Sequence, residues 1–163
     1  MEKLEVSPKI TLKNIMKATS RSATIFQPNQ GKTLFLLGNT VTYKFDDQVQ
    51  GTKLYEFVGT ATSELPPLHT HPWDEWFYFL DGEVAFQVGR RLVQAIPGSV
   101  VHLPAGVAHT FHIKSSQAKF LVGVSSVAAE QYLKDLAAAA QKRELSSSEL
   151  IAISQRHGIQ FVN

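Results

Sequence analysis

The chain has 163 residues, 44% of them hydrophobic, and it contains no cysteine. Its 16 basic and 14 acidic residues leave a formal net charge of +2, which gives no strong field for nucleic acid or a membrane surface. The lack of cysteine excludes disulfides and thiolate metal sites, and without an apolar run of about 18 residues no transmembrane helix is predicted.

The length and ordinary hydrophobic content predict a single domain over residues 1–163. We expect an N-terminal arm at 1–33, a core barrel at about 34–125 and C-terminal helices at about 126–158. The first 20 residues lack the apolar core of a signal peptide, so we expect a cytoplasmic protein.

Short β-strands are expected along most of the chain. Residues 22–26 and 34–37 are two candidates, each closed by a cluster of turn-forming residues. Alternation of apolar and polar residues then predicts strands at 41–45, 54–61, 75–80, 83–88, 92–96, 100–103, 109–113 and 120–124. Many short strands separated by Gly, Pro and Asn turns predict an all-β sandwich or barrel.

Two helices are expected after the strands, because the apolar residues then follow helical spacing. Ser126 is placed to cap the first helix. Ser146 and Glu149 form the capping-box pattern for the second, and Gly158 suits the position just beyond its end.

A candidate metal site lies within the strand region. His69 and His71 are two residues apart, so their imidazoles project from one face of an extended strand. If that strand pairs with the one that starts at Glu75, a carboxylate joins the two imidazoles. Neutral imidazole and carboxylate are ligands of Fe, Mn, Ni, Co and Zn. His109, which follows a Pro-x-Gly turn, is the candidate fourth ligand.

The spacing of these residues resembles a known family. His69-x-His71-x3-Glu75-x6-Gly82, followed by Gly98-x5-Pro104-x-Gly106-x2-His109, resembles the two signature motifs of the cupin superfamily. Residues 34 to about 160 also resemble small bacterial quercetin 2,3-dioxygenase-like cupins. The resemblance implies a double-stranded β-helix, or jelly roll, followed by two α-helices. It also implies one divalent transition metal held by His69, His71, Glu75 and His109.

The implied activity is that of a metal-dependent dioxygenase. Its partners would be O2 and an aromatic, flavonol-like or enediol small molecule, and Glu75 would also act as the base that takes the substrate's hydroxyl proton. Two alternatives stay open: a non-catalytic cupin that binds a small molecule or a metal, and a cupin isomerase.

The chain departs from the family pattern at three positions. Ser63 stands where the first motif usually opens with glycine, Ser99 where the second often has aspartate, and Ile113 where an asparagine often follows the last histidine. None of these family positions is a metal ligand. Ile113 makes the expected pocket more apolar, which weakens the case for a sugar substrate.

Strand periodicity also predicts the residues that surround the metal. Phe77 and Phe79 share a side with Glu75, and Phe111 and Ile113 share a side with His109. We expect these four to line a substrate pocket, with ordinary core packing as the alternative for each.

Other residues are assigned to surface or structural roles. We expect His102, His112 and His157 to have such surface or structural roles. Trp76 and Tyr78 alternate with Glu75 and should point outward. They would supply the interface of a homodimer, or alternatively pack under the N-terminal arm.

Overall fold

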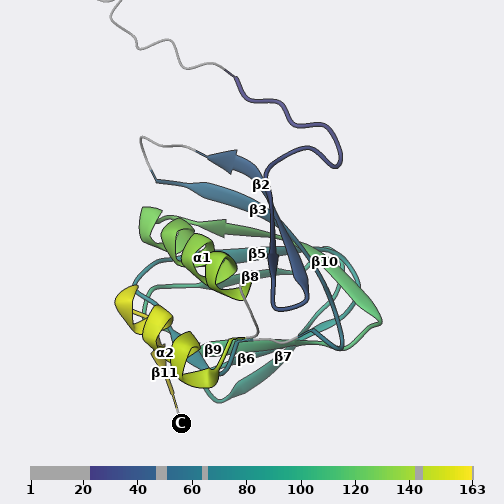
Figure 1. Cartoon of the computed structure of the whole chain (residues 1–163). Coiled ribbons are helices and arrows are strands. Elements are labelled where there is room, and N and C mark those ends of the chain that lie inside the picture. Colours follow the sequence, from purple (N-terminus) through teal and green to yellow (C-terminus); the bar gives the residue numbers. More distant parts are fainter. Residues whose placement is uncertain (1–22, 47–50, 64–65, 142–144, 163) are drawn as a thin grey trace, which may run out of the picture.

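Two β-sheets face each other and enclose the core, as the computed structural model shows (Figure 1). The structure describes residues 23–46, 51–63, 66–141 and 145–162. Most of the expected N-terminal arm therefore lies outside the described residues. The strand predicted at 22–26 is wrong over 23–26, which have no regular structure.

All strand pairings are antiparallel. The larger sheet contains, in spatial order, β1 (Thr33–Leu36), β2 (Asn39–Asp46), β3 (Lys53–Thr60), β10 (Gln117–Val124), β5 (Glu75–Asp81) and β8 (Val100–Leu103). The smaller sheet contains β11 (Gln160–Phe161), β4 (His69–Thr70), β9 (His109–Ile113), β6 (Val84–Val88) and β7 (Arg91–Ala95). Two helices follow the strands, α1 (Val127–Ala140) and α2 (Ser147–Arg156).

This arrangement confirms the predicted all-β jelly roll with two C-terminal helices. Side chains that alternate inward from the two sheets fill the space between them, as in other β-sandwiches. The centre is aromatic: Phe79, Phe86 and Phe120 are almost fully buried, and the ring centroids of Phe79 and Phe120 are 5.2 Å apart. Each such ring contributes about 1.5–3 kcal/mol when it is removed from water.

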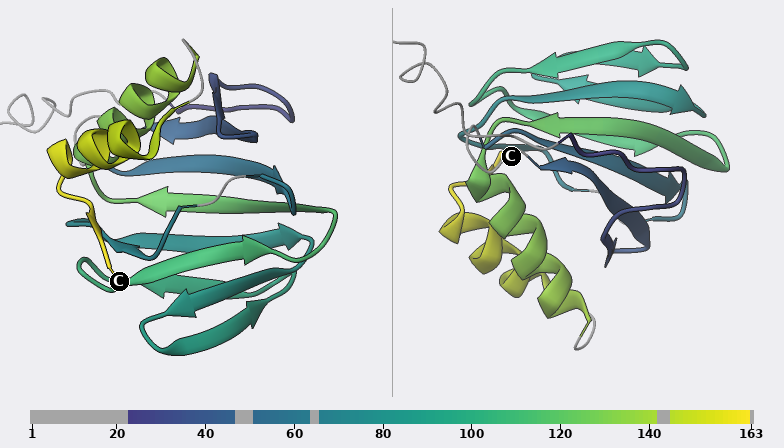
Figure 2. Two further views of the ribbon diagram at one scale, coloured as in Figure 1. Left: turned by 60° about the horizontal axis from the view of Figure 1, so that its bottom comes forward. Right: turned by 90° about the horizontal axis from the view of Figure 1, so that it is seen from above.

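Both helices begin where the sequence predicts, and α2 also ends there. The Ser126 side chain accepts a hydrogen bond from the Ala128 amide at the start of α1. Ser146 and Glu149 form the complete capping box of α2, and Gly158 follows the helix with φ +79°. Both helices lie on the same side of the sheets (Figure 2). Within the described part of the chain, neither has the length and apolar character needed to cross a bilayer.

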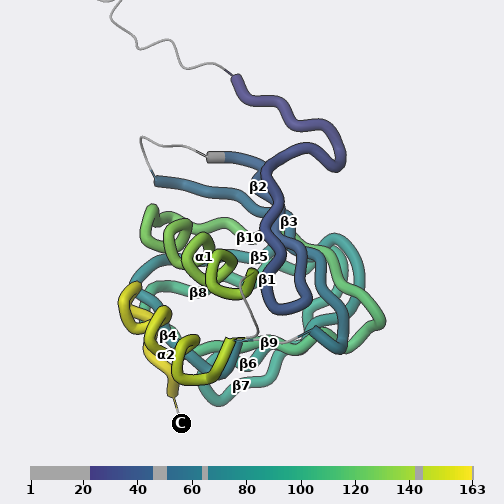
Figure 3. The backbone as a smooth tube through the Cα atoms, in the orientation of Figure 1, coloured from purple at the N-terminus to yellow at the C-terminus, as the bar shows by residue number. Residues whose placement is uncertain are grey.

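The chain after α2 adds a strand that the sequence reasoning did not predict. The tube through the Cα atoms turns back past α2 and ends beside β4 (Figure 3). There β11 pairs with β4, with Phe161 opposite His69. Only two residues of β11 form ladder pairs, too few for alternation to be recognised in the sequence.

Candidate metal centre and its pocket

Three histidines and one glutamate meet at one end of the interior. His69 lies in β4 directly opposite His109 of β9, and His71 follows β4 by one residue. Glu75 begins β5, which belongs to the other sheet. The His69 strand and the Glu75 strand therefore do not pair, although their pairing was the condition under which the carboxylate was expected to join the imidazoles. The turn through Pro72 carries the chain from one sheet to the other, so the carboxylate reaches the imidazoles across the interior.

Backbone contacts fix the two motifs against each other. The Gly106 amide donates to the His71 carbonyl at 2.8 Å, and the Ala105 amide donates to Asp74 Oδ1 at 2.9 Å. The Trp73 ring stacks on His71 with 4.7 Å between centroids and 7° between planes. The turn that precedes His109 is thus attached to the loop that carries His71.

Each histidine uses the same ring nitrogen to hold its orientation. The Nδ1 atoms of His69, His71 and His109 lie 2.8, 2.8 and 2.9 Å from the carbonyls of Pro67, Trp73 and Val107. A carbonyl oxygen only accepts, so each Nδ1 carries the proton. Each Nε2 is then left with a free lone pair, which is the form that binds a metal.

The three imidazoles are grouped closely enough to share one ion. One ligand atom from each of His69, His71 and His109 lies within 4.8 Å of the other two. Burial, with the neighbouring His109 adding to it, lowers the pKa of His69 to about 4. The His69 ring is therefore neutral at physiological pH, as a metal ligand must be.

Glu75 lies beside this histidine group rather than within it. Its Oε2 is 3.0 Å from His71 Nε2 and 3.5 Å from His109 Nε2. Burial alone would raise the pKa of Glu75, but hydrogen bonds with His109 and His71 outweigh it and bring the pKa to about 2. The carboxylate is thus ionised. Its hydrogen bonds with His71 and His109 need a proton on each Nε2, whereas the tautomer set by the carbonyls has a lone pair there. A proton or a cation is therefore required between the carboxylate and the two rings. The donor set fits a divalent metal.

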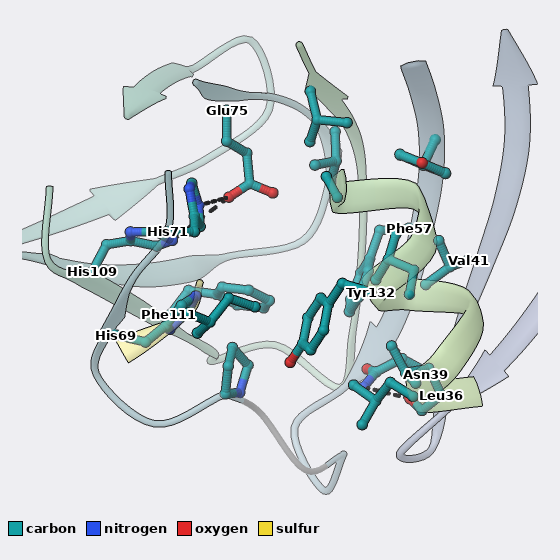
Figure 4. Close-up of a pocket in the computed structure, with 18 of the residues that line it drawn as sticks. Leu36, Asn39, Val41, Phe57, His69, His71, Glu75, His109, Phe111 and Tyr132 are labelled. Carbon is teal, nitrogen blue, oxygen red and sulfur yellow. Dashed lines mark hydrogen bonds and ion pairs between the residues drawn. The ribbon is translucent and has the colours of Figure 1, made fainter. Parts of the chain in front are cut away.

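A cavity of about 420 Å³ opens from these residues toward the helices. Figure 4 shows the histidines on one side of it and Leu36 and Asn39 on the other. Of the predicted pocket residues, Phe77 and Phe111 line the cavity. Phe79 and Ile113 do not: they are buried farther along their strands, in the closed part of the core. Periodicity identifies the inward side of a strand but not how far along it the cavity extends.

The sequence reasoning missed the opposite wall of the cavity, which comes from the helices and from β1 to β3. Tyr132 of α1 contributes a hydroxyl that lies 3.3 Å from Ser154 Oγ of α2. Burial raises the pKa of Tyr132, so this phenol keeps its proton. Helical spacing does mark Tyr132 as inward-facing, but only the tertiary structure shows that it lines the same cavity as the three histidines. No lysine or arginine of the described residues lines this cavity.

The remaining histidines lie away from the cavity. His102 and His112 are exposed, and His112 points outward from the strand that carries His109 inward. His157 follows the last residue of α2 and its Nε2 lies 2.9 Å from Asp135 Oδ2 of α1. That contact joins the two helices, as a structural role predicts.

Comparison with known proteins agrees with this geometry. Residues 57–124 match the cupin domain family model, Cupin_2. An uncharacterized protein from Streptomyces coelicolor is 42% identical over 64 residues, which are 39% of this chain and only 57% of that protein.

Solved structures share the fold at low sequence identity. KdgF from Halomonas sp. has a TM-score of 0.58 at 11% identity, over 64% of this chain and 94% of that one. An RmlC-like cupin from Shewanella frigidimarina has a TM-score of 0.56 at 15% identity, over 65% and 93% of the two chains. The polyketide cyclase RemF from Streptomyces resistomycificus has a TM-score of 0.55 at 21% identity, over 65% and 86%. These structures show that the chain shares their fold, and the family match shows that its residues 57–124 are similar to a cupin domain.

Proposed function

We propose that this chain is a metal-dependent dioxygenase acting on an aromatic or enediol compound, such as a flavonol, that binds through a hydroxyl oxygen. The observation that carries the proposal is the single cavity shared by the His69, His71 and His109 group and a wall of phenylalanine and leucine side chains. A metal at the three imidazoles would keep coordination positions free for O2 and for the substrate.

The lining of the cavity supports an uncharged ring compound. About 420 Å³ lies in the usual size range of small-molecule sites. With no lysine or arginine among the described lining residues, a phosphate or carboxylate group that lies away from the metal would be buried without a counter-ion, which is costly. Phe77, Phe111 and Phe57 instead offer faces and edges to a planar ligand.

The protein's own groups prepare the substrate. When bound, a divalent metal acts as a Lewis acid toward the substrate's hydroxyl oxygen. Glu75 adjoins His71 and His109, so its position suits a base that takes the hydroxyl proton, a role that requires its pKa to be higher in the loaded site than the value of about 2 found here. The apolar wall excludes water from the substrate's ring system. The Tyr132 hydroxyl offers the substrate one hydrogen bond.

An isomerase that uses the same residues is the second candidate. Glu75 Oε2 lies 3.0 Å from His71 Nε2 and lines the cavity, so its carboxylate is placed for proton transfer without any oxygen chemistry. The two functions differ in whether O2 is consumed.

Oxygen uptake tests the proposal. Protein loaded separately with Fe, Mn, Ni or Co is mixed anaerobically with a flavonol, and oxygen is then admitted at an electrode. We expect uptake with at least one metal, and a loss of about 100-fold in rate for Glu75→Gln because the base is removed. Glu83→Gln is the matched control, since this exposed carboxylate lies at a hairpin turn away from the cavity.

No uptake with any of these metals would contradict the dioxygenase proposal. Conversion of the flavonol or of an enediol without oxygen consumption would instead support the isomerase. Equal rates for the Glu75 and Glu83 variants would remove the assigned role of Glu75.

A further inference from the structure

The turn between β1 and β2 has an unusual residue at its first position. Leu36 pairs with Asn39, so Leu37 and Gly38 alone form the turn. Both have positive φ, +50° at Leu37 and +78° at Gly38, as in type I′ hairpins. That turn favours Asn or Gly at both positions, because a larger side chain is strained in the left-handed region. A leucine here is disfavoured by the local backbone.

Neighbouring polar side chains hold the turn in this conformation. Asn39 Nδ2 donates to the carbonyls of Leu36 and Leu37 at 3.1 and 3.2 Å. Ser63 Oγ donates to the Gly38 carbonyl at 3.2 Å and lies 3.1 Å from the Thr60 amide. The serine that replaces the usual glycine of the first motif therefore has a structural task here. Strain that surrounding contacts maintain in this way is typical of functional positions.

The Leu37 side chain faces the ligand cavity rather than solvent. It is half-buried and lines the cavity together with Leu36 and Asn39. In Figure 4 these two flanking residues lie across the cavity from His69 and His109. A ligand that contacts both the histidines and the turn must therefore span the cavity.

We propose that the Leu37–Gly38 turn is the distal specificity wall of the pocket, with Leu37 packing against the second ring of an uncharged, two-ring ligand whose hydroxyl end lies at the histidines. The proposal rests on the proposed ligand class but not on oxygen chemistry. The strained leucine serves ligand contact, and Ser63 and Asn39 keep it in place. Replacing it should therefore affect the binding of long ligands more than it affects the fold.

Binding to Zn²⁺-loaded protein under anaerobic conditions tests this without turnover. The probes are 3-hydroxyflavone, followed by fluorescence, and the single-ring catechol, followed by calorimetry. We expect Leu37→Asn to weaken 3-hydroxyflavone binding about tenfold, the size of effect that one lost apolar contact in a pocket gives. Catechol affinity should stay within a factor of two of wild type, and the midpoint of thermal unfolding should not fall, because Asn suits the turn.

Two further variants complete the test. Leu92→Asn is the matched control, since this strand residue is 80% exposed and does not line the cavity; both probes should bind it as they bind wild type. Ser63→Gly removes the hydrogen bond to the Gly38 carbonyl. We expect this variant to bind 3-hydroxyflavone more weakly than wild type, as Leu37→Asn does, while its affinity for catechol stays unchanged.

Three results would overturn the inference. One is a wild-type chain that does not bind 3-hydroxyflavone. Another is equal weakening of both probes in Leu37→Asn. The third is a clear drop in the unfolding midpoint with unchanged 3-hydroxyflavone affinity, which would make Leu37 a packing residue only. If the probe binds as expected but no oxygen is consumed, the dioxygenase proposal fails while this inference stands.

Discussion

The orientation of three imidazole rings decides what the centre can bind. In each of His69, His71 and His109, Nδ1–H donates a hydrogen bond to a carbonyl two residues away in sequence. The lone pairs needed for a metal are thus set by the backbone before any ion arrives. Such preorganisation reduces the reorganisation that metal binding would otherwise require.

Substitutions on β9 test this centre at the level of one side chain. His109→Ala removes an inward ligand, and we expect the affinity for Zn²⁺ measured by calorimetry to fall at least about 100-fold. His112→Ala is the matched control three residues away on the same strand, because its side chain is exposed and faces outward. Unchanged Zn²⁺ affinity in the His109 variant would show that this residue does not hold the metal.

The histidines that group together, and Glu75 beside them, could be predicted from the sequence, but the geometry of the site and the extent of its pocket could not. The spacing of His69 and His71 marks two ligands on one strand face, and a Pro-x-Gly turn marks His109. The position of Glu75 beside the histidine group depends on which sheet each strand joins, and that is decided by long-range pairing. The contributions of Tyr132 and Leu37 depend on tertiary packing in the same way.

Helix α1 forms part of the cavity wall, and a buried ion pair holds its first turn on the barrel. Lys53 Nζ of β3 lies 3.2 Å from Glu130 Oε2, and Lys134 contacts the other oxygen of Glu130. The Lys53 side chain is completely buried. Burial alone would raise the pKa of Glu130, but hydrogen bonds from Lys134 and Lys53 outweigh it and lower the pKa. The attachment of α1 therefore depends on an ionised Glu130.

Stability against pH tests this attachment. A folded-state pKa below the unfolded value of about 4.3 means that Glu130 stabilises the fold above that pH. The stabilisation is lost as the pH falls through the folded-state pKa. We expect Glu130→Gln to lower the unfolding free energy by about 3 kcal/mol at pH 7, because it leaves Lys53 buried beside a neutral group. The difference from wild type, measured by urea unfolding, should shrink below pH 4.

Glu56→Gln is the comparison for that measurement. Glu56 lies 3.1 Å from Lys119, whose side chain is 41% exposed. Such a pair contributes about 0–1 kcal/mol, so this variant should differ little from wild type. If Glu130→Gln were equally mild at pH 7, the ion pair would not be what holds α1 in place.

At the level of elements, the sequence predicts regular segments well and short ones poorly. Helix α2 follows from its capping box, and the strands between residues 75 and 113 follow from alternation. Strands β4 and β11 each have two residues, so their existence depends on their partners rather than on their own periodicity. The change of sheet between β4 and β5 likewise depends on tertiary contacts.

On the scale of the whole molecule, the outer face of β5 is the predicted interface of a homodimer. Trp76 and Tyr78 point outward as expected, with 37% and 40% of their surface exposed. Leu80 of the same strand and Val100 of β8 are also exposed. Exposed aromatic residues of this kind are enriched at protein interfaces.

Sedimentation velocity tests the interface. We expect wild-type chain to sediment as a dimer and Tyr78→Lys to shift it toward monomer, because a charge would be buried at the contact. Leu92→Lys, on the exposed face of β7, should leave the distribution unchanged. A wild-type chain that sediments only as monomer would contradict the interface.

The pairing of β11 with β4 has a consequence for how the protein is made. One edge of β4 is filled by β9 and the other by residues 160–161, which the ribosome adds after the three grouped histidines and after α1 and α2. Until they emerge, the strand that carries His69 keeps an open edge, and open edges invite wrong partners. A chain truncated before residue 160 should therefore leave this edge of the His69 strand unpaired, and its three histidines should be held less firmly in place.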